Sequence, residues 1–66
     1  MVARNRFLVI RVDGGLVGAV TPHSDWRTAK RLSDSIARKL DPDDHDVVIW
    51  DLDEDAVVYN PFRSQE

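Results

Sequence analysis

The sequence predicts an α+β domain of the order ββαββ, in which a four-stranded antiparallel sheet of two hairpins carries one helix packed on one face. Two observations predict this fold. Four short runs are rich in β-branched and aromatic residues, and a longer stretch between the second and third runs has apolar residues at three- and four-residue steps. The 66 residues suffice for a single small domain over 1–66. We expect residues 1–5 and 63–66 to be loose tails.

The first hairpin is predicted by a strand, a tight turn and a returning strand. Residues 7–12 are apolar except for one arginine and are followed by Asp13-Gly14-Gly15. Such a turn sequence suits a hairpin because glycine accepts positive φ. Residues 16–20 form the returning strand, in which Gly18 marks a bulge or a close approach of another group.

A helix is expected from about residue 24 to residue 40. Thr21 would be its N-cap with Pro22 at the first helical position, or Ser24 would be the cap instead. Pro42 ends the helix, because proline disfavours helical geometry in the residue before it. The stripe that would face the sheet comprises Trp26, Ala29, Leu32, Ile36, Ala37 and Leu40.

The second hairpin follows a charged loop at residues 43–46. Residues 47–52 are predicted as the third strand, 53–55 as a turn and 56–59 as the fourth strand. Asn60-Pro61 then closes the hairpin.

Both faces of the predicted sheet are apolar near its middle. In the first strand Leu8, Ile10 and Val12 point to one face, and Phe7 and Val9 point to the other. The third strand divides in the same way. Val48, Trp50 and Leu52 point to one face, and Val47 and Ile49 point to the other. A single helix covers only one face, so a homodimer or a protein partner is expected to cover the other.

Charge is divided unevenly along the chain. Residues 1–40 hold eight of the nine Lys and Arg residues and three acids, whereas residues 41–66 hold nine acids and one Arg, for net charges of +5 and −8. This asymmetry predicts an electrostatic interaction surface, within the protein or toward a partner. The chain has no Cys, no apolar run long enough to span a membrane and no secretory signal pattern, so a cytoplasmic location is expected.

The acidic stretch is the first candidate site. In an extended chain Asp51, Asp53 and Asp55 would point to one face with about 6.6 Å between neighbours, which suits a basic groove that binds nucleic acid. Trp50 and Tyr59 are candidate hydrophobic anchors if they are exposed. The acidic residues predicted to contact the partner are Asp41, Asp43, Asp44, Asp46, Asp51, Asp53, Glu54 and Asp55. The alternative is that these acids serve solubility and pair with the protein's own basic helix.

A metal site and a catalytic site are not expected. An EF-hand loop starting at Asp51 would need Gly at its sixth position and Glu at its twelfth, where the chain has Ala56 and Phe62. His23 and His45 lack the paired spacing of a zinc site. The consecutive residues His23, Ser24 and Asp25 have the residue types of a hydrolase triad but not its geometry, and no Gly-rich phosphate loop is present. No cofactor is therefore expected.

In size, absence of Cys and concentration of acids in residues 41–55, the chain resembles small phage-encoded inhibitors such as anti-CRISPR proteins and other DNA mimics. The resemblance implies a non-enzymatic inhibitor whose acidic patch blocks the basic nucleic-acid-binding groove of a partner complex. The net charge of −3 and the basic helix depart from the strongest DNA mimics and favour a local patch.

Two other functions remain open. The chain would be a small nucleic-acid-binding regulator if Arg27, Lys30, Arg31 and Arg38 on the helix bind phosphates, although its pI of about 5.2 argues against this. It would be a self-assembling structural module if the basic half of one copy meets the acidic half of another.

Overall fold

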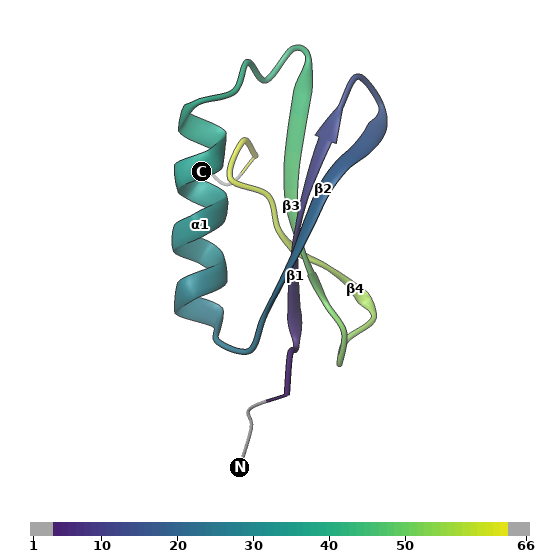
Figure 1. Cartoon of the computed structure of the whole chain (residues 1–66), viewed down its shortest axis with the longest axis vertical. Helices are drawn as coiled ribbons and strands as arrows, with labels where there is room; N and C mark the ends of the chain where they lie inside the picture. Colours follow the sequence, from purple (N-terminus) through teal and green to yellow (C-terminus); the bar gives the residue numbers. More distant parts are fainter. Residues whose placement is uncertain (1–3, 64–66) are drawn as a thin grey trace.

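The computed structural model describes residues 4–63 and has the predicted ββαββ order. Its single sheet is antiparallel throughout, with the strand order β2-β1-β3-β4. One helix packs against this sheet (Figure 1). The elements are β1 (Phe7–Asp13), β2 (Leu16–His23), α1 (Trp26–Arg38), β3 (His45–Asp51) and β4 (Ala56–Tyr59). The predicted fold class is therefore confirmed.

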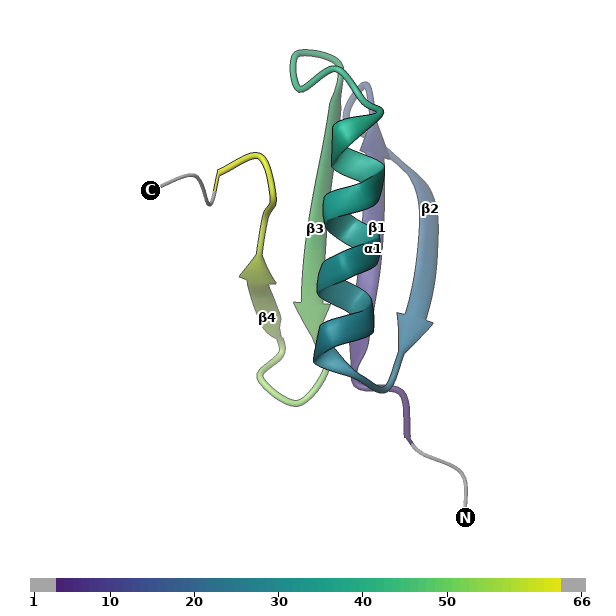
Figure 2. The same ribbon diagram turned by 90° about the vertical axis from the view of Figure 1, so that its left-hand side faces the viewer.

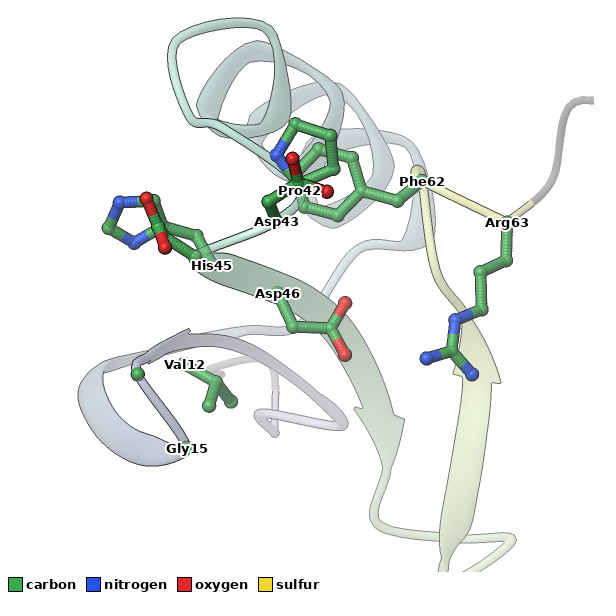
Figure 3. Close-up of a pocket in the computed structure, with 10 residues that line it drawn as sticks. Val12, Gly15, Pro42, Asp43, His45, Asp46, Phe62 and Arg63 are labelled. Carbon is green, nitrogen blue, oxygen red and sulfur yellow. The ribbon is translucent and has the colours of Figure 1, made fainter.

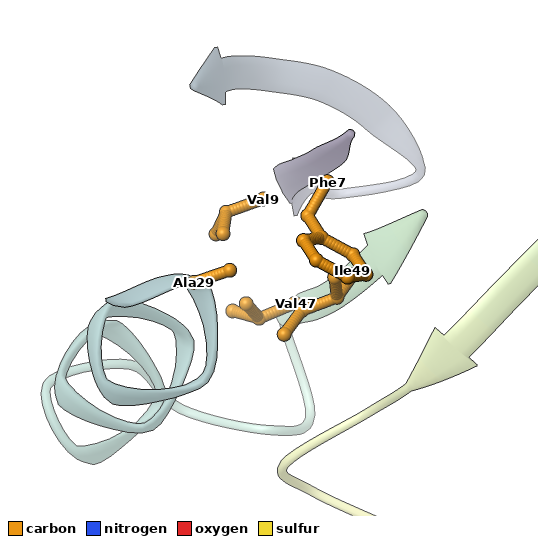
Figure 4. Packing of buried hydrophobic residues seen from close by; sticks show 5 residues of the cluster. All are labelled: Phe7, Val9, Ala29, Val47 and Ile49. Carbon is orange, nitrogen blue, oxygen red and sulfur yellow. The ribbon is translucent and has the colours of Figure 1, made fainter. Parts of the chain in front are cut away.

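The helix lies across the two central strands, β1 and β3 (Figure 2). Among residues 4–63 no element covers the other face of the sheet, as the view in Figure 1 shows. Between helix and sheet lies a small core of five buried apolar residues (Figure 4). Val9 and Ile49 are directly opposite each other in the β1–β3 register, and both point toward the helix. The core residues are Phe7, Val9, Ala29, Val47 and Ile49.

The helix begins later than the sequence predicts, and neither predicted N-cap is used. Thr21 and Pro22 belong to β2, where they pair with Val9 and Leu8 of β1. Strand β2 is an edge strand, and an edge strand tolerates the N–H that proline lacks. Asp25 is the N-cap, since its Oδ2 accepts hydrogen bonds from Thr28 N and Thr28 Oγ1, each at 2.8 Å.

The helix also differs from the predicted stripe at two positions. Trp26 was expected in the core but is 38% exposed, with its ring edge-on to Phe7 and Tyr59 at centroid distances of 5.3 and 5.8 Å. Ser33, which the apolar pattern omits, is fully buried. Its hydroxyl donates to Lys30 O at 2.9 Å, so a polar side chain fits inside the core without an unpaired donor.

The glycines of the first hairpin confirm the predicted turn and bulge. Gly14 and Gly15 have φ values of 57° and 85°, as a two-residue hairpin turn requires. Gly18 is the extra residue where the register of β2 shifts against β1. A methyl group there would collide with the carboxylate of Asp13, which pairs with Arg11.

Candidate interaction surfaces

The face of the sheet opposite the helix, here called the open face, is almost entirely apolar. The register fixes its members, because every second residue of each strand points away from the helix. Asp46 is its one charged residue. The open face comprises Leu8, Ile10 and Val12 of β1, Val17, Val20 and Pro22 of β2, Asp46, Val48 and Trp50 of β3, and Val57 of β4.

No residue of the open face is fully buried, in contrast to the core on the other side of the same strands. Its central side chains, those of β1 and β3, are half-buried by their neighbours. Toward the edges, Val20 and Val57 are 47% and 49% exposed. The predicted second apolar face is thus present across all four strands, and no described part of the chain covers it.

The acidic turn after β3 is held by the segment that precedes β1. Arg6 donates through Nε and Nη2 to the two carboxylate oxygens of Asp51 at 3.0 and 2.9 Å. The backbone N–H of Asp53 donates to Asp51 Oδ1 at 2.9 Å, and Arg4 pairs with Asp53 at 2.6 Å. The hydrogen bonds between Arg6 and Asp51 are the main reason that the pKa of Asp51 is lowered. The same hydrogen bonds raise the pKa of Arg6.

The interpretation of Asp51, Asp53 and Asp55 as a carboxylate ladder on an extended strand is therefore wrong. Strand β3 ends at Asp51, and residues 52–55 form a turn in which Asp55 has a positive φ of 55°. Asp51 is only 3% exposed and faces the helix side of the sheet. Its carboxylate binds the chain's own Arg6, so it does not present its charge to a partner.

The remaining predicted acids lie at the two ends of β3, in separate groups. Asp41, Asp43 and Asp44 belong to the loop between α1 and β3, whereas Glu54 and Asp55 belong to the β3–β4 turn. All five are exposed. In Figure 1 the loop is at the top of the molecule and the turn is at the bottom. The eight acids thus form no continuous surface.

An open hollow of about 410 Å³ lies beside the first of these groups (Figure 3). It is lined by the β1–β2 turn, the α1–β3 loop and the segment around Phe62. A backbone hydrogen bond joins the turn to the loop, because Gly14 N donates to Asp44 O at 2.9 Å. Nearby, His45 Nδ1 lies 2.8 Å from Asp13 Oδ1, a contact that lowers the pKa of Asp13. Within residues 4–63 no group of three or more His, Asp or Glu side chains is arranged to hold a metal ion.

The two predicted aromatic anchors point to opposite sides of the sheet. Trp50 lies on the open face, between Leu8 and Val57 in the register. Tyr59 lies on the helix side, where its hydroxyl donates to Asp34 at 2.7 Å. Tyr59 therefore holds β4 to the helix, and Trp50 alone fits the predicted role of an anchor on an uncovered surface.

The basic face of the helix points away from the sheet. Lys30 pairs with Asp34 at 3.2 Å, and this hydrogen bond raises the pKa of Lys30. Arg27, Arg31 and Arg38 are exposed and form no salt bridge or side-chain hydrogen bond among residues 4–63. Within residues 4–63 the acidic stretch forms no salt bridge with this helix, contrary to the alternative considered above. Arg4 and Arg6, which precede β1, pair with Asp51 and Asp53.

The pairing of Arg4 with Asp53 and of Arg6 with Asp51 was not predicted from the sequence. A signal for it exists in the chain: Arg4 and Arg6 precede β1, and Asp51 and Asp53 come at the end of its antiparallel partner β3. The register places Phe7 opposite Asp51, so the two charged segments meet. The predicted loose tail at residues 1–5 therefore has an ordered contact at Arg4, while residues 1–3 and 64–66 lie outside the described part.

Comparison with known protein families, curated proteins and solved structures finds no match to this chain. No relative therefore indicates a function for the open face, the acidic groups or the basic helix. Among the described residues no helix is long and apolar enough to cross a membrane.

Proposed function

We propose that this protein is a non-enzymatic interaction module that works as a homodimer, in which two copies pack their open faces against each other. The observation that carries the proposal is the apolar open face itself. Its ten residues include one charged side chain, Asp46, which lies at one end and accepts a hydrogen bond from Asn60 at 2.8 Å. Two sheets packed face to face would form an α/β/β/α sandwich.

The size of the open face fits such an interface. Four strands spaced about 4.8 Å apart, with about 3.3 Å per residue along β1, give a footprint of roughly 400 Å². The largest apolar patch on a typical monomer measures about 300–600 Å² and is often functional, so the open face has the size of such a site. Small stable interfaces bury about 600 Å² on each partner, an area that projecting side chains over this footprint would approach.

A second copy is the occupant that the chemistry of the face favours. The open face lacks the charges that would select a partner of opposite sign, and it complements itself through aliphatic packing. The basic helix is on the far side of each copy, so the dimer brings no cationic surfaces together.

The small core also favours self-association. Five buried apolar residues in a chain without Cys supply limited stability, because a domain of this size rarely gains more than about 3–5 kcal/mol from one core. Packing a second apolar layer against the open face would add to the stability of the fold.

The edges of the sheet favour face-to-face over edge-to-edge contact. Strand β4 has only four residues, and β2 carries Pro22 and the bulge at Gly18. Short strands, prolines and bulges all hinder the pairing of an edge with another chain.

The test is sedimentation equilibrium of the wild type and of two lysine variants over micromolar to millimolar concentrations. We expect the wild type to reach twice its chain mass of 7.5 kDa. Ile10→Lys places a charge at the centre of the open face and should give a folded monomer. Leu16→Lys, at a residue that is 75% exposed and outside the open face, should leave the dimer intact. A monomeric wild type, or equal behaviour of the two variants, would refute the proposal.

A second candidate function is the inhibitor that blocks a basic groove of a nucleic-acid-handling complex. One observation supports it: Asp43, Asp44, Glu54 and Asp55 form no salt bridge among residues 4–63 and are exposed. The test is capture of partners from a host lysate at low and high salt. Asp43→Asn/Asp44→Asn should lose a salt-sensitive partner, whereas the matched variant Asp51→Asn should retain it. Retention by both variants argues against this function.

A further inference from the structure

The outward side of the helix forms a shallow groove of about 370 Å³ that combines an aromatic ring with several cations. It borders Tyr59 of β4, whose ring contacts Trp26 and whose hydroxyl donates to Asp34. Figure 2 shows α1 in front of the sheet, with β4 to one side of it. With four cations and one carboxylate, its net charge is +3, whereas the whole chain carries −3. The groove is lined by Trp26, Arg27, Lys30, Arg31, Asp34 and Arg38.

Three of these cations are not used by the fold. Arg4, Arg6 and Arg11 each pair with an aspartate, whereas Arg27, Arg31 and Arg38 form no salt bridge or side-chain hydrogen bond among residues 4–63. Each guanidinium offers five N–H donors in a planar fork, which matches the geometry of phosphate oxygens. The groove therefore presents donors that are suited to phosphates and make no side-chain hydrogen bond among residues 4–63, although their charges help to lower the pKa values of Asp25 and Asp34.

Trp26 supplies an aromatic side chain at one end of the groove. Its ring is held edge-on by Phe7 and Tyr59, so the packing of the core fixes its orientation. The residue is nevertheless 38% exposed, at the position where Arg27 and Lys30 begin the row of cations. A rigid, partly exposed indole beside cations is the combination that stacks an unpaired base while its phosphates are neutralised.

We propose that this groove binds single-stranded nucleic acid, with phosphates on Arg27, Arg31 and Arg38 and a base stacked on Trp26. Single strands are favoured over duplexes because only an unpaired base is free to stack on the ring. Carboxylates at Asp25 and Asp41 flank the helix, so the cationic surface is limited to its thirteen residues, about 20 Å of axis. The site therefore accommodates a short segment.

The proposal is independent of the homodimer. Packing of two open faces would place both helices outward, so each copy keeps its groove accessible. The overall net charge of −3 disfavours nucleic acid, which makes the interaction weak. Three phosphate contacts predict a slope of about −2 when log Kobs is plotted against log salt concentration.

The test is fluorescence anisotropy of a labelled oligothymidylate titrated with the full chain at low salt. Arg27→Gln/Arg31→Gln removes two of the three contacts and should weaken binding roughly tenfold or more. The matched control, Lys39→Gln/Arg63→Gln, changes the net charge equally at two exposed cations outside the groove and should bind nearly as the wild type does. Circular dichroism checks that both variants remain folded.

Competition by inorganic polyphosphate and by an oligoglutamate peptide distinguishes the classes of ligand. We expect both to compete less well than unlabelled oligothymidylate, because neither provides a base for Trp26. Equal loss of binding in the two double variants would overturn the proposal, since only net charge would then matter. Tighter binding of oligoglutamate would also overturn it and would assign the groove to an acidic protein.

Discussion

The two faces of the sheet are built from the same kinds of residue but have different surroundings. Val47 and Val48 are neighbours in β3, yet Val47 is fully buried under the helix and Val48 is half-buried on the open face. The same holds along β1, where Phe7 and Val9 are buried and Leu8 and Ile10 are not. Strand periodicity therefore gives this chain two apolar surfaces, and the single helix covers one of them.

An apolar pattern alone does not identify a core. The covered face receives Ala29 and the partly buried side chains of Leu32 and Ile36 from α1. The open face receives no second layer from the described residues. An apolar side chain contributes its full share to the stability of the monomer only where a second layer excludes water from it.

The largest expected difference between the two faces is in the free energy of unfolding, which a matched pair of truncations measures. Val47→Ala should reduce the free energy of unfolding by about 2 kcal/mol, because it removes two buried methyl-sized groups and leaves a cavity. Val48→Ala should cost less than about 1 kcal/mol at low protein concentration. Urea denaturation followed by circular dichroism measures both values.

The stability costs of the same two truncations should depend differently on protein concentration. If two open faces pack together, the cost of Val48→Ala grows with concentration, because it weakens the dimer as well as the monomer. The cost of Val47→Ala should stay nearly constant. Equal costs for the two variants at every concentration would mean that the faces are energetically alike, contrary to their burial.

A smaller change in stability is expected at Asp51, which lies at the end of β3 on the covered face. Asp51→Asn should lower the urea midpoint at pH 7, because it replaces the carboxylate that binds Arg6 and accepts the N–H of Asp53. The pKa of Asp51 is lowered in the fold from its ordinary 3.8, chiefly by Arg6. A group of this kind stabilises the protein above its unfolded pKa, and the stabilisation is lost as the pH falls through its folded pKa.

The difference between the wild type and Asp51→Asn should therefore shrink as the pH drops below about 4. Both proteins will still lose stability in acid, since Asp13, Asp25 and Asp34 also have lowered pKa values. The matched control is Asp55→Asn in the exposed turn, which should change the midpoint little at any pH. A difference for Asp51→Asn that is independent of pH would rule out the ion pair as its cause.

Local patterns predicted most of the fold because the residues that decide them are close in sequence. The Asp-Gly-Gly turn and the bulge at Gly18 each depend on a few neighbouring positions, and both are present. Of the predicted helix stripe, Ala29, Leu32, Ile36 and Leu40 contact or belong to the core. The start of the helix was missed because Thr21 and Pro22 satisfy the rules for a helix N-terminus as well as those for an edge strand. Pairing with Val9 and Leu8 of β1 decided between the two.

The order of the elements, the two apolar faces and the separation of charge between the halves of the chain follow from the sequence alone. Which charges remain available depends on how the chain folds. Arg6 and Asp51 lie 45 positions apart, and they meet because the β1–β3 register places Phe7 opposite Asp51. That contact neutralises part of the acidic stretch, whereas the helix residues Arg27, Arg31 and Arg38 form no salt bridge among residues 4–63. The physical reason is that a charge pair depends on distance in space, which composition and spacing along the chain do not specify.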